Sequence, residues 1–154
     1  MRAGDVNYEI RDARWSDCGA MSRKLCDGRW LAYKAAGVDP RAQLRVLWAT
    51  SSVRRSCLID GRLVAMWGMA GTLLSRCGQV WLVIADEASR HPYALLREVK
   101  RQLAEFSSSR KELKATIAAQ DGTALRFATF IGFKEDGAPV QSAGADIFVV
   151  PMRR

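Results

Sequence analysis

The sequence predicts an α/β fold in which helices cover both faces of a mixed central sheet, and three observations carry the prediction. Asp60-Gly61 separates two strand-like runs, residues 52–60 and 62–70, and this dipeptide is a strong signal for a two-residue hairpin turn. Residues 79–86, QVWLVIAD, are almost wholly apolar, as expected of a strand buried on both faces. A helix should follow, because one helical face collects Leu95, Leu96, Val99, Leu103 and Phe106.

Length and composition favour one ordinary globular domain spanning residues 1–154. The chain has 154 residues, of which 49% are hydrophobic and 26% charged, enough for a substantial core. It lacks a run of 18 apolar residues, so no transmembrane helix is expected. The first 15 residues lack the apolar centre of a signal peptide. We therefore expect a protein kept in a cytoplasm or packaged from one.

The first half of the chain should contain one strand and two helices before the hairpin. Residues 6–15 alternate as a strand does. Asp17 is expected to cap a helix that ends at Gly37. Asp39-Pro40 combines a capping residue with a proline at the first helical position, and predicts a second helix over residues 41–50.

The second half should contain a short helix and two strands, with one further strand before the last. Residues 106–112, FSSSRKE, are interpreted as a loop between the long helix and the next strand. The remaining elements are a strand at 112–119, a short helix capped by Asp121, a last strand at 145–152 and one further strand near 138–142. The predicted order is β-α-α-β-β-β-α-β-α-β, which gives a mixed sheet with helices on both faces.

Residues 124–133, ALRFATFIGF, carry a family resemblance. They resemble the "A-I-x-L-Y-x-K-x-G-F" segment of the GNAT N-acetyltransferases, in which this segment closes the helix after the fifth strand. Gly132 is expected to end the helix in a left-handed conformation, and Phe133 to begin the turn into the last hairpin. The predicted order of elements is similar to the GNAT fold over nearly the whole chain.

A narrower resemblance rests on three segments: KAAGVDP at 34–40, the run at 81–103, and RFATFIGF at 126–133. Together they resemble a phage GNAT-like group that includes the internal virion protein A proteins of short-tailed phages. That group also carries a proline-containing loop in place of the glycine loop. The resemblance implies a bacteriophage structural protein rather than an enzyme.

The loop in residues 87–96, EASRHPYALL, stands where a GNAT enzyme holds the acetyl-CoA pyrophosphate in an R/Q-x-x-G-x-G/A loop. The matching positions fall across Arg90, His91 and Pro92, and the stretch contains no glycine. Pro92 has no N–H to donate, and side chains at the other positions would crowd a phosphate. We therefore expect that the cofactor function has been lost and that the protein binds no cofactor.

A second landmark of the family is also changed. Many GNAT enzymes place a proton-donating tyrosine five residues before the Phe of the G-F ending, and that position here is Ala128. Many also carry an asparagine seven residues earlier, where this sequence has Asp121. Alanine cannot donate a proton, and an aspartate at a helix start is more simply a cap.

The leading hypothesis is a phage virion-associated or assembly protein that has kept the GNAT fold without acetyl-CoA chemistry. The alternative is an active N-acetyltransferase that uses acetyl-CoA through the atypical loop. In that case backbone amides of Ala88, Ser89 and Arg90 would meet the pyrophosphate, with Asp121 nearby. Catalytic candidates would be Asp86 or Glu87 as a base, and His91, which could also form an anion site with Arg90.

The sequence predicts no metal site. The four cysteines, Cys18, Cys26, Cys57 and Cys77, form no C-x-x-C pair, and the single histidine, His91, is far from all of them. Buried free thiols are the simplest interpretation.

Charge and tryptophan content bear on partners. The formal net charge is +8, but no basic block of five or six residues appears, so a solvated basic surface is the simplest interpretation. Non-specific contact with DNA stays open, as does a nucleic-acid binding module. Trp67 and Trp81 should pack in the core, while Trp30 and Trp48 are either core or a partner surface. We expect other virion or assembly proteins as partners, no membrane, and a location in the virion or host cytoplasm.

Overall fold

The computed structural model describes residues 7–25, 37–70, 77–90, 92–109, 112–118, 122–141 and 148–154. The strands are β1 (Tyr8–Asp12), β2 (Ser51–Ile59), β3 (Arg62–Ala70), β4 (Cys77–Ile84), β5 (Glu112–Ala118), β6 (Lys134–Glu135), β7 (Val140–Gln141) and β8 (Phe148–Arg153). The α-helices are α1 (Trp15–Ser22), α3 (Pro40–Thr50), α4 (Pro92–Ser109) and α5 (Gly122–Phe130). A 3-10 helix, η1 (Asp86–Arg90), joins β4 to α4.

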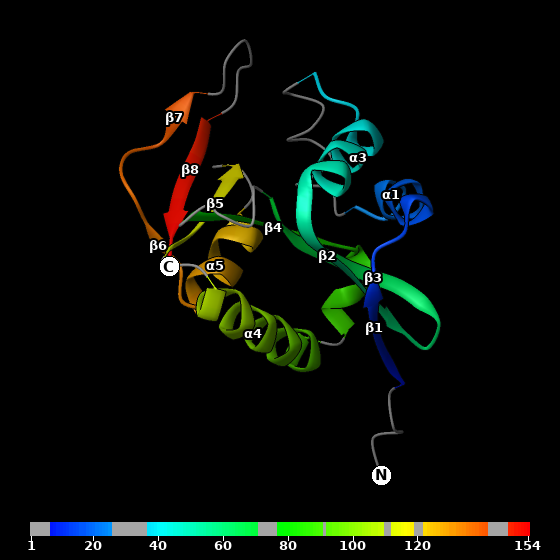
Figure 1. Cartoon of the computed structure of the whole chain (residues 1–154). Helices are drawn as coiled ribbons and strands as arrows, with labels where there is room; N and C mark the ends of the chain where they lie inside the picture. Colours follow the sequence, from blue (N-terminus) through cyan, green and yellow to red (C-terminus); the bar gives the residue numbers. More distant parts are fainter. Residues whose placement is uncertain are drawn as a thin grey trace.

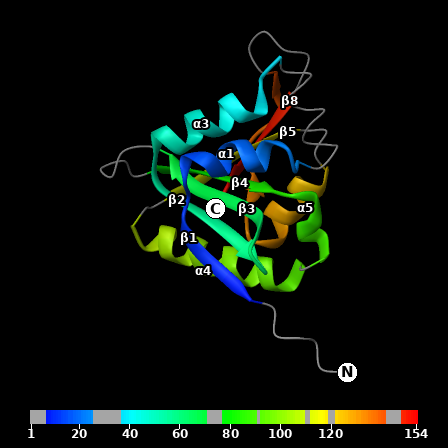
Figure 2. The same cartoon turned by 90° about the vertical axis from the view of Figure 1, so that its right-hand side faces the viewer.

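The strands form one mixed sheet in the order β1-β2-β3-β4-β5-β8-β6, with β7 also paired to β8. Every pairing is antiparallel except β4 with β5, which is parallel. Helices α1 and α3 cover one face of the sheet, and α4 and α5 cover the other (Figures 1 and 2). The predicted α/β class, with helices on both faces of a mixed sheet, is confirmed.

The hairpin between β2 and β3 turns at Asp60 and Gly61, as predicted. Both residues have positive φ, 50° and 77°, which is the conformation that a two-residue type I′ turn requires. Ile59 pairs directly with Arg62 across the turn. The turn therefore sets the register of the two central antiparallel strands.

The core consists of two clusters, one on each face of the sheet. Strand β3 is buried almost along its whole length, and its neighbouring residues Met66 and Trp67 serve opposite clusters. Met66 packs with Met21 and Leu44 beneath α1 and α3. Trp67 packs on the other face, in the cluster that also takes the predicted helix positions Leu95, Val99, Leu103 and Phe106. Trp81 is partly buried against the first of these clusters.

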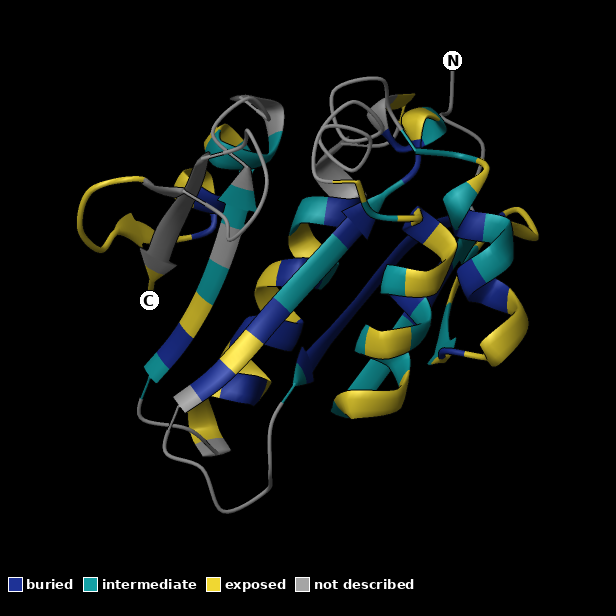
Figure 3. Cartoon of the chain, turned by 90° about the horizontal axis from the view of Figure 1, so that it is seen from above, coloured by how far each residue is buried: buried dark blue, intermediate teal, exposed yellow. Residues whose placement is uncertain are grey.

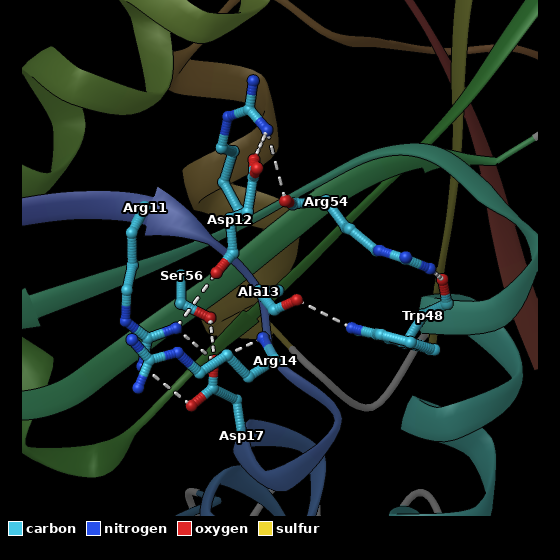
Figure 4. A network of polar contacts seen from close by, with 9 residues as sticks. Arg11, Asp12, Ala13, Arg14, Asp17, Trp48, Arg54 and Ser56 are labelled. Atoms are coloured by element: carbon cyan, nitrogen blue, oxygen red, sulfur yellow. Dashed lines mark hydrogen bonds and ion pairs between the residues drawn. The ribbon is translucent and has the colours of Figure 1, made fainter.

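The start of α1 corrects the predicted cap. The helix begins at Trp15, so Asp17 is the third helical residue and not the capping residue. Its carboxylate accepts hydrogen bonds from the Arg14 backbone N–H at 2.8 Å, the Ser56 hydroxyl at 2.8 Å, and the Arg11 guanidinium (Figure 4). An aspartate at this position satisfies a free N–H from inside the first turn, as the acidic member of a capping box does. The contacts join β1, α1 and β2 at one buried point.

Two further predictions on element bounds change. Helix α1 ends at Ser22, and residues 23–25 form a turn and a β-bridge, so the predicted continuous helix to Gly37 is wrong. Residues 26–36 of that prediction, with Trp30, lie outside the described residues. Helix α4 continues through Ser109, so most of the predicted 106–112 loop is helical, and the Ser108 hydroxyl donates to the Glu105 carbonyl within it. Helix α3 agrees with prediction, since Asp39 accepts a hydrogen bond from the Arg41 N–H at its start.

The end of the chain follows the predicted order. Helix α5 gives way to Gly132, whose φ of 106° is the positive value that was predicted. Strand β7 corresponds to the further strand expected near 138–142, and β8 to the last strand. The two-residue strand β6 is an addition, formed where Phe133 leads the chain back toward β8.

Candidate functional site

The candidate site lies where β4 and β5 part. The two strands share only three residue pairs, from Cys77↔Glu112 to Gln79↔Lys114. Beyond these pairs β4 continues alongside β3, and β5 continues alongside β8. Figure 3 shows the carboxyl ends of β4 and β5 diverging from their common start. We call this divergence, residues 80–84 of β4 and 115–118 of β5, the β4–β5 fork.

Open α/β sheets form ligand sites beyond the carboxyl ends of neighbouring parallel strands, so the fork is where a ligand is expected. The β4–β5 pair is the parallel one in this sheet, and it is followed directly by η1 and then α4. The fork and η1 therefore bring the sequence-predicted cofactor loop to the position that the fold class favours for binding.

The segment η1 is a closed turn and not an open anion cradle. The Ala88 N–H donates to the Ala85 carbonyl at 3.0 Å, which uses this amide within the turn. The Ala88 side chain is 2% exposed and packs in the same cluster as Leu95 and Val99. Ala88 was a candidate cofactor contact for the case that the protein is an enzyme. Its amide bonds within the turn and its side chain packs in the core, so neither is directed toward a ligand.

A segment that follows α1 occupies the edge of β4 at the fork. Leu25 forms an isolated antiparallel bridge with Ala85, and the Asp86 N–H donates to the Lys24 carbonyl at 3.0 Å. The Ala85 N–H donates to the Val64 carbonyl of β3. Because backbone groups of successive strand residues point to opposite edges, the N–H of the next residue, Asp86, points away from β3. Lys24 and Leu25 therefore lie along the β4 edge that faces the fork.

Glu87 is held as an ionised carboxylate by two cations. The Lys24 ammonium lies 2.9 Å from one carboxylate oxygen, and the Arg62 guanidinium lies 3.8 Å from the other. The hydrogen bond from Lys24 is the main cause that lowers the pKa of Glu87 below its usual value. A carboxylate with a lowered pKa accepts a proton less readily, so this environment opposes the role of general base.

The remaining predicted site residues do not converge in the described structure. Asp86 and Arg90 are exposed at the two ends of η1. His91, Asp121 and the side chain of Ser89 lie outside the described residues. The structure instead adds Lys24 to the site, a residue 63 positions from Glu87 that no local sequence signal identifies.

Ala128 occupies the position of the family's proton-donating tyrosine. It lies on α5, is buried in the same cluster as Phe133, and its carbonyl accepts the Phe133 N–H at 3.0 Å. The methyl group packs and offers no proton. This position serves the core and the turn after α5.

No group of three histidine, cysteine, aspartate or glutamate side chains is placed to hold a metal ion within the described ranges. Among the helices described, none combines the length and the hydropathy needed to span a bilayer.

Comparisons with known proteins identify the fold. No family model matches the sequence, and no curated protein matches it either. Among solved structures, a spermidine N-acetyltransferase from Vibrio cholerae in complex with CoA and spermine is 15% identical, with a TM-score of 0.66 over 96% of this chain and 94% of that one. The ribosomal-protein-S18-alanine N-acetyltransferase of Escherichia coli is 13% identical, with a TM-score of 0.66 over 96% and 92%.

An aminoglycoside acetyltransferase in complex with coenzyme A is 16% identical, with a TM-score of 0.64 over 96% of this chain and 94% of that one. Likeness at this level of identity, over nearly the full length of both chains, shows a common fold. The chain has the GNAT N-acetyltransferase fold, as the resemblance of residues 124–133 implied.

Proposed function

We propose that this protein is a phage virion-associated or assembly protein whose GNAT fold no longer carries acetyl-CoA chemistry. The observation that carries the proposal is the internal use of the loop amides: the Asp86 N–H bonds to Lys24, and the Ala88 N–H bonds to Ala85. A pyrophosphate cradle needs such donors free and converging on the anion. Of the three amides named for the pyrophosphate, that of Ala88 is engaged within the turn, which supports a loop that no longer holds acetyl-CoA.

Further support comes from Ala128 and from the phage resemblance of the sequence. A buried methyl group replaces the proton donor, so the chemistry would be impaired even with cofactor bound. The segments at 34–40, 81–103 and 126–133 resemble the internal virion protein group. In this role the fold provides binding surfaces for other virion or assembly proteins, in the virion or the host cytoplasm, and its positive charge assists contact with DNA.

The second candidate is an active N-acetyltransferase, and the β4–β5 fork favours it. The strands part as the sheet of a ligand-binding α/β protein does, and solved structures with this fold include complexes with CoA. Glu87 or Asp86 would then be the base, with Lys24 close to Glu87 as an additional charge.

Titration of the purified protein with acetyl-CoA by calorimetry tests the two candidates. The proposal expects no binding up to about 1 mM, because losing a few charge-assisted hydrogen bonds weakens affinity by orders of magnitude. Micromolar binding would overturn it. A parallel assay of CoA release with a polyamine, a peptide α-amine and an aminoglycoside should stay at background. CoA release above background that either Asp86→Asn or Glu87→Gln abolishes would establish the second candidate.

A further inference from the structure

Helices α1 and α3 pack with a basic row between them. Trp15 and Gly19 lie one turn apart on α1, and Arg41 and Arg45 lie one turn apart on α3. The Arg45 guanidinium lies 4.7 Å from the centroid of the Trp15 ring. A Cβ built on Gly19 would lie 3.6 Å from Cδ of Arg41 and 3.8 Å from a terminal nitrogen of Arg23. We call these five residues, Trp15, Gly19, Arg23, Arg41 and Arg45, the α1–α3 seam.

The arginines of the seam have no acidic partner among the described residues. Of the ion pairs between described residues, none involves Arg23, Arg41 or Arg45. The Nε atom of Arg45 is buried and, within the described structure, has no hydrogen-bond acceptor. Several other arginines do hold carboxylates: Arg11, Arg55, Arg62, Arg101 and Arg153. Three guanidinium charges without carboxylate partners among the described residues make the seam suited to an external anion.

Two described acidic residues close to the seam in sequence are already engaged. Asp39 lies at the start of α3, where it accepts the Arg41 backbone N–H at 3.4 Å. Asp17 is buried beneath α1 and is held by Arg11 and Ser56. Neither of these two carboxylates therefore neutralises a guanidinium of the seam.

Trp15 is held in place but is still 48% exposed. Its ring meets Trp48 edge to face, with centroids 5.3 Å apart. Trp48 is itself fixed, because its Nε1–H donates to the Ala13 carbonyl at 2.8 Å and the Arg54 guanidinium lies 3.6 Å above its ring (Figure 4). The seam thus ends in an aromatic surface that is ordered before any ligand arrives, which lowers the entropic cost of binding.

We propose that the α1–α3 seam binds single-stranded nucleic acid, with phosphates on Arg23, Arg41 and Arg45 and a base stacked at Trp15. A row of cations beside an exposed, rigid aromatic ring is the combination that binds single strands without sequence preference. An acidic peptide would use the charges but not the aromatic surface. The inference goes beyond the proposed function, since it assigns a ligand to a surface away from the fork and does not depend on acetyl-CoA.

Fluorescence anisotropy with a labelled oligo-dT of about 12 nucleotides, a length within the range of single-strand sites, provides the test. For three phosphate contacts, the logarithm of the affinity should fall with the logarithm of salt concentration with a slope of about −2. No binding by the wild-type protein at about 50 mM salt would overturn the proposal.

A matched pair of charge variants separates the seam from net charge. Arg41→Gln should weaken binding several-fold and lower the salt slope by about 0.7. Arg97→Gln removes the same charge from an exposed position on α4, across the sheet, and should leave the slope unchanged. Equal weakening by the two variants would assign binding to overall charge and overturn the site.

Variants of Trp15 test the stacking contact. Trp15→Leu should weaken binding at least about fivefold, whereas Trp15→Tyr should restore most of it, because tyrosine also stacks on bases. Thermal melts of each variant show whether the fold is kept. If Trp15→Leu has no effect while poly-glutamate displaces the oligonucleotide efficiently, the seam belongs to an acidic protein partner and the proposal fails.

Discussion

The Arg11 guanidinium donates hydrogen bonds to both carboxylate oxygens of Asp17, at 2.6 and 3.0 Å, although the two residues lie in different elements. Asp17 is 6% exposed and also accepts from the Arg14 N–H and the Ser56 hydroxyl. Four donors on one buried carboxylate fix the junction of β1, α1 and β2. The Arg11–Asp17 pair therefore holds helix α1 against the sheet.

Asp17→Asn should destabilise the protein by about 3 kcal/mol, because it leaves the partly buried Arg11 charge without its partner. Urea unfolding measures this free energy. Asp12→Asn is the matched control, since Asp12 pairs with Arg55 but its side chain is 83% exposed, and it should cost less than about 1 kcal/mol. Similar losses in the two variants would contradict the role assigned to Asp17.

Acid should weaken the fold through the same carboxylate. Burial raises the pKa of Asp17, but the hydrogen bonds from Arg11, the Arg14 backbone and Ser56 outweigh it and leave the pKa below its usual value. A lowered folded-state pKa gives stability that is present above the unfolded pKa of about 3.9 and is lost as pH falls through the folded value. The difference in unfolding free energy between wild type and Asp17→Asn should therefore shrink below about pH 4. A constant difference down to the folded-state pKa would contradict this assignment.

Gly68→Ala should destabilise the sheet by about 2 kcal/mol. A Cβ at this position of β3 would lie 2.4 Å from the Val53 carbonyl oxygen and 2.8 Å from the Trp81 ring, so backbone would have to move. Gly19→Ala is the matched control, because its Cβ would meet side chains only at ordinary contact distance and alanine favours a helix by about 1 kcal/mol. Thermal melts should show a lower melting temperature than wild type for Gly68→Ala and a higher one for Gly19→Ala.

Cys57 should resist alkylation in the native protein. Its side chain is 0% exposed, and burial, together with the nearby Glu98 charge, raises the pKa of the thiol to about 11. Roughly one thiol in a thousand would be ionised at pH 8, and the thiolate is the reactive form. Iodoacetamide labelling followed by peptide mass spectrometry should find Cys57 modified only in urea. Rapid native labelling would show that this part of the core opens readily.

Features encoded within a few residues could be predicted from the sequence. Asp60-Gly61 specifies its turn because both positions need positive φ, and the apolar positions from Leu95 to Phe106 form a helical face whatever lies opposite. Asp17 shows the limit of local reasoning. An aspartate satisfies helix N–H groups either as the cap or from the third position, and contacts with Arg11 and Ser56 decide between them.

The candidate site depends on contacts that sequence periodicity does not encode. The fork arises because β4 and β5 pair with each other over only three residues. Beyond these, β4 pairs with β3 alone and β5 pairs with β8 alone among the described strands. Lys24 meets Glu87 across 63 positions, and its carbonyl takes the Asp86 amide. The absence of glycine from residues 87–96 indicated a changed loop, but only the structure shows which amides the loop uses internally.

The brief pairing of β4 with β5 also divides the sheet along the chain. Among the described strands, β1 to β4 pair with one another on one side of it, and β5 to β8 pair with one another on the other. The first group is complete by residue 84, and the second begins at residue 112. A nascent chain can therefore assemble the β1–β4 half of its sheet before the β5–β8 half leaves the ribosome.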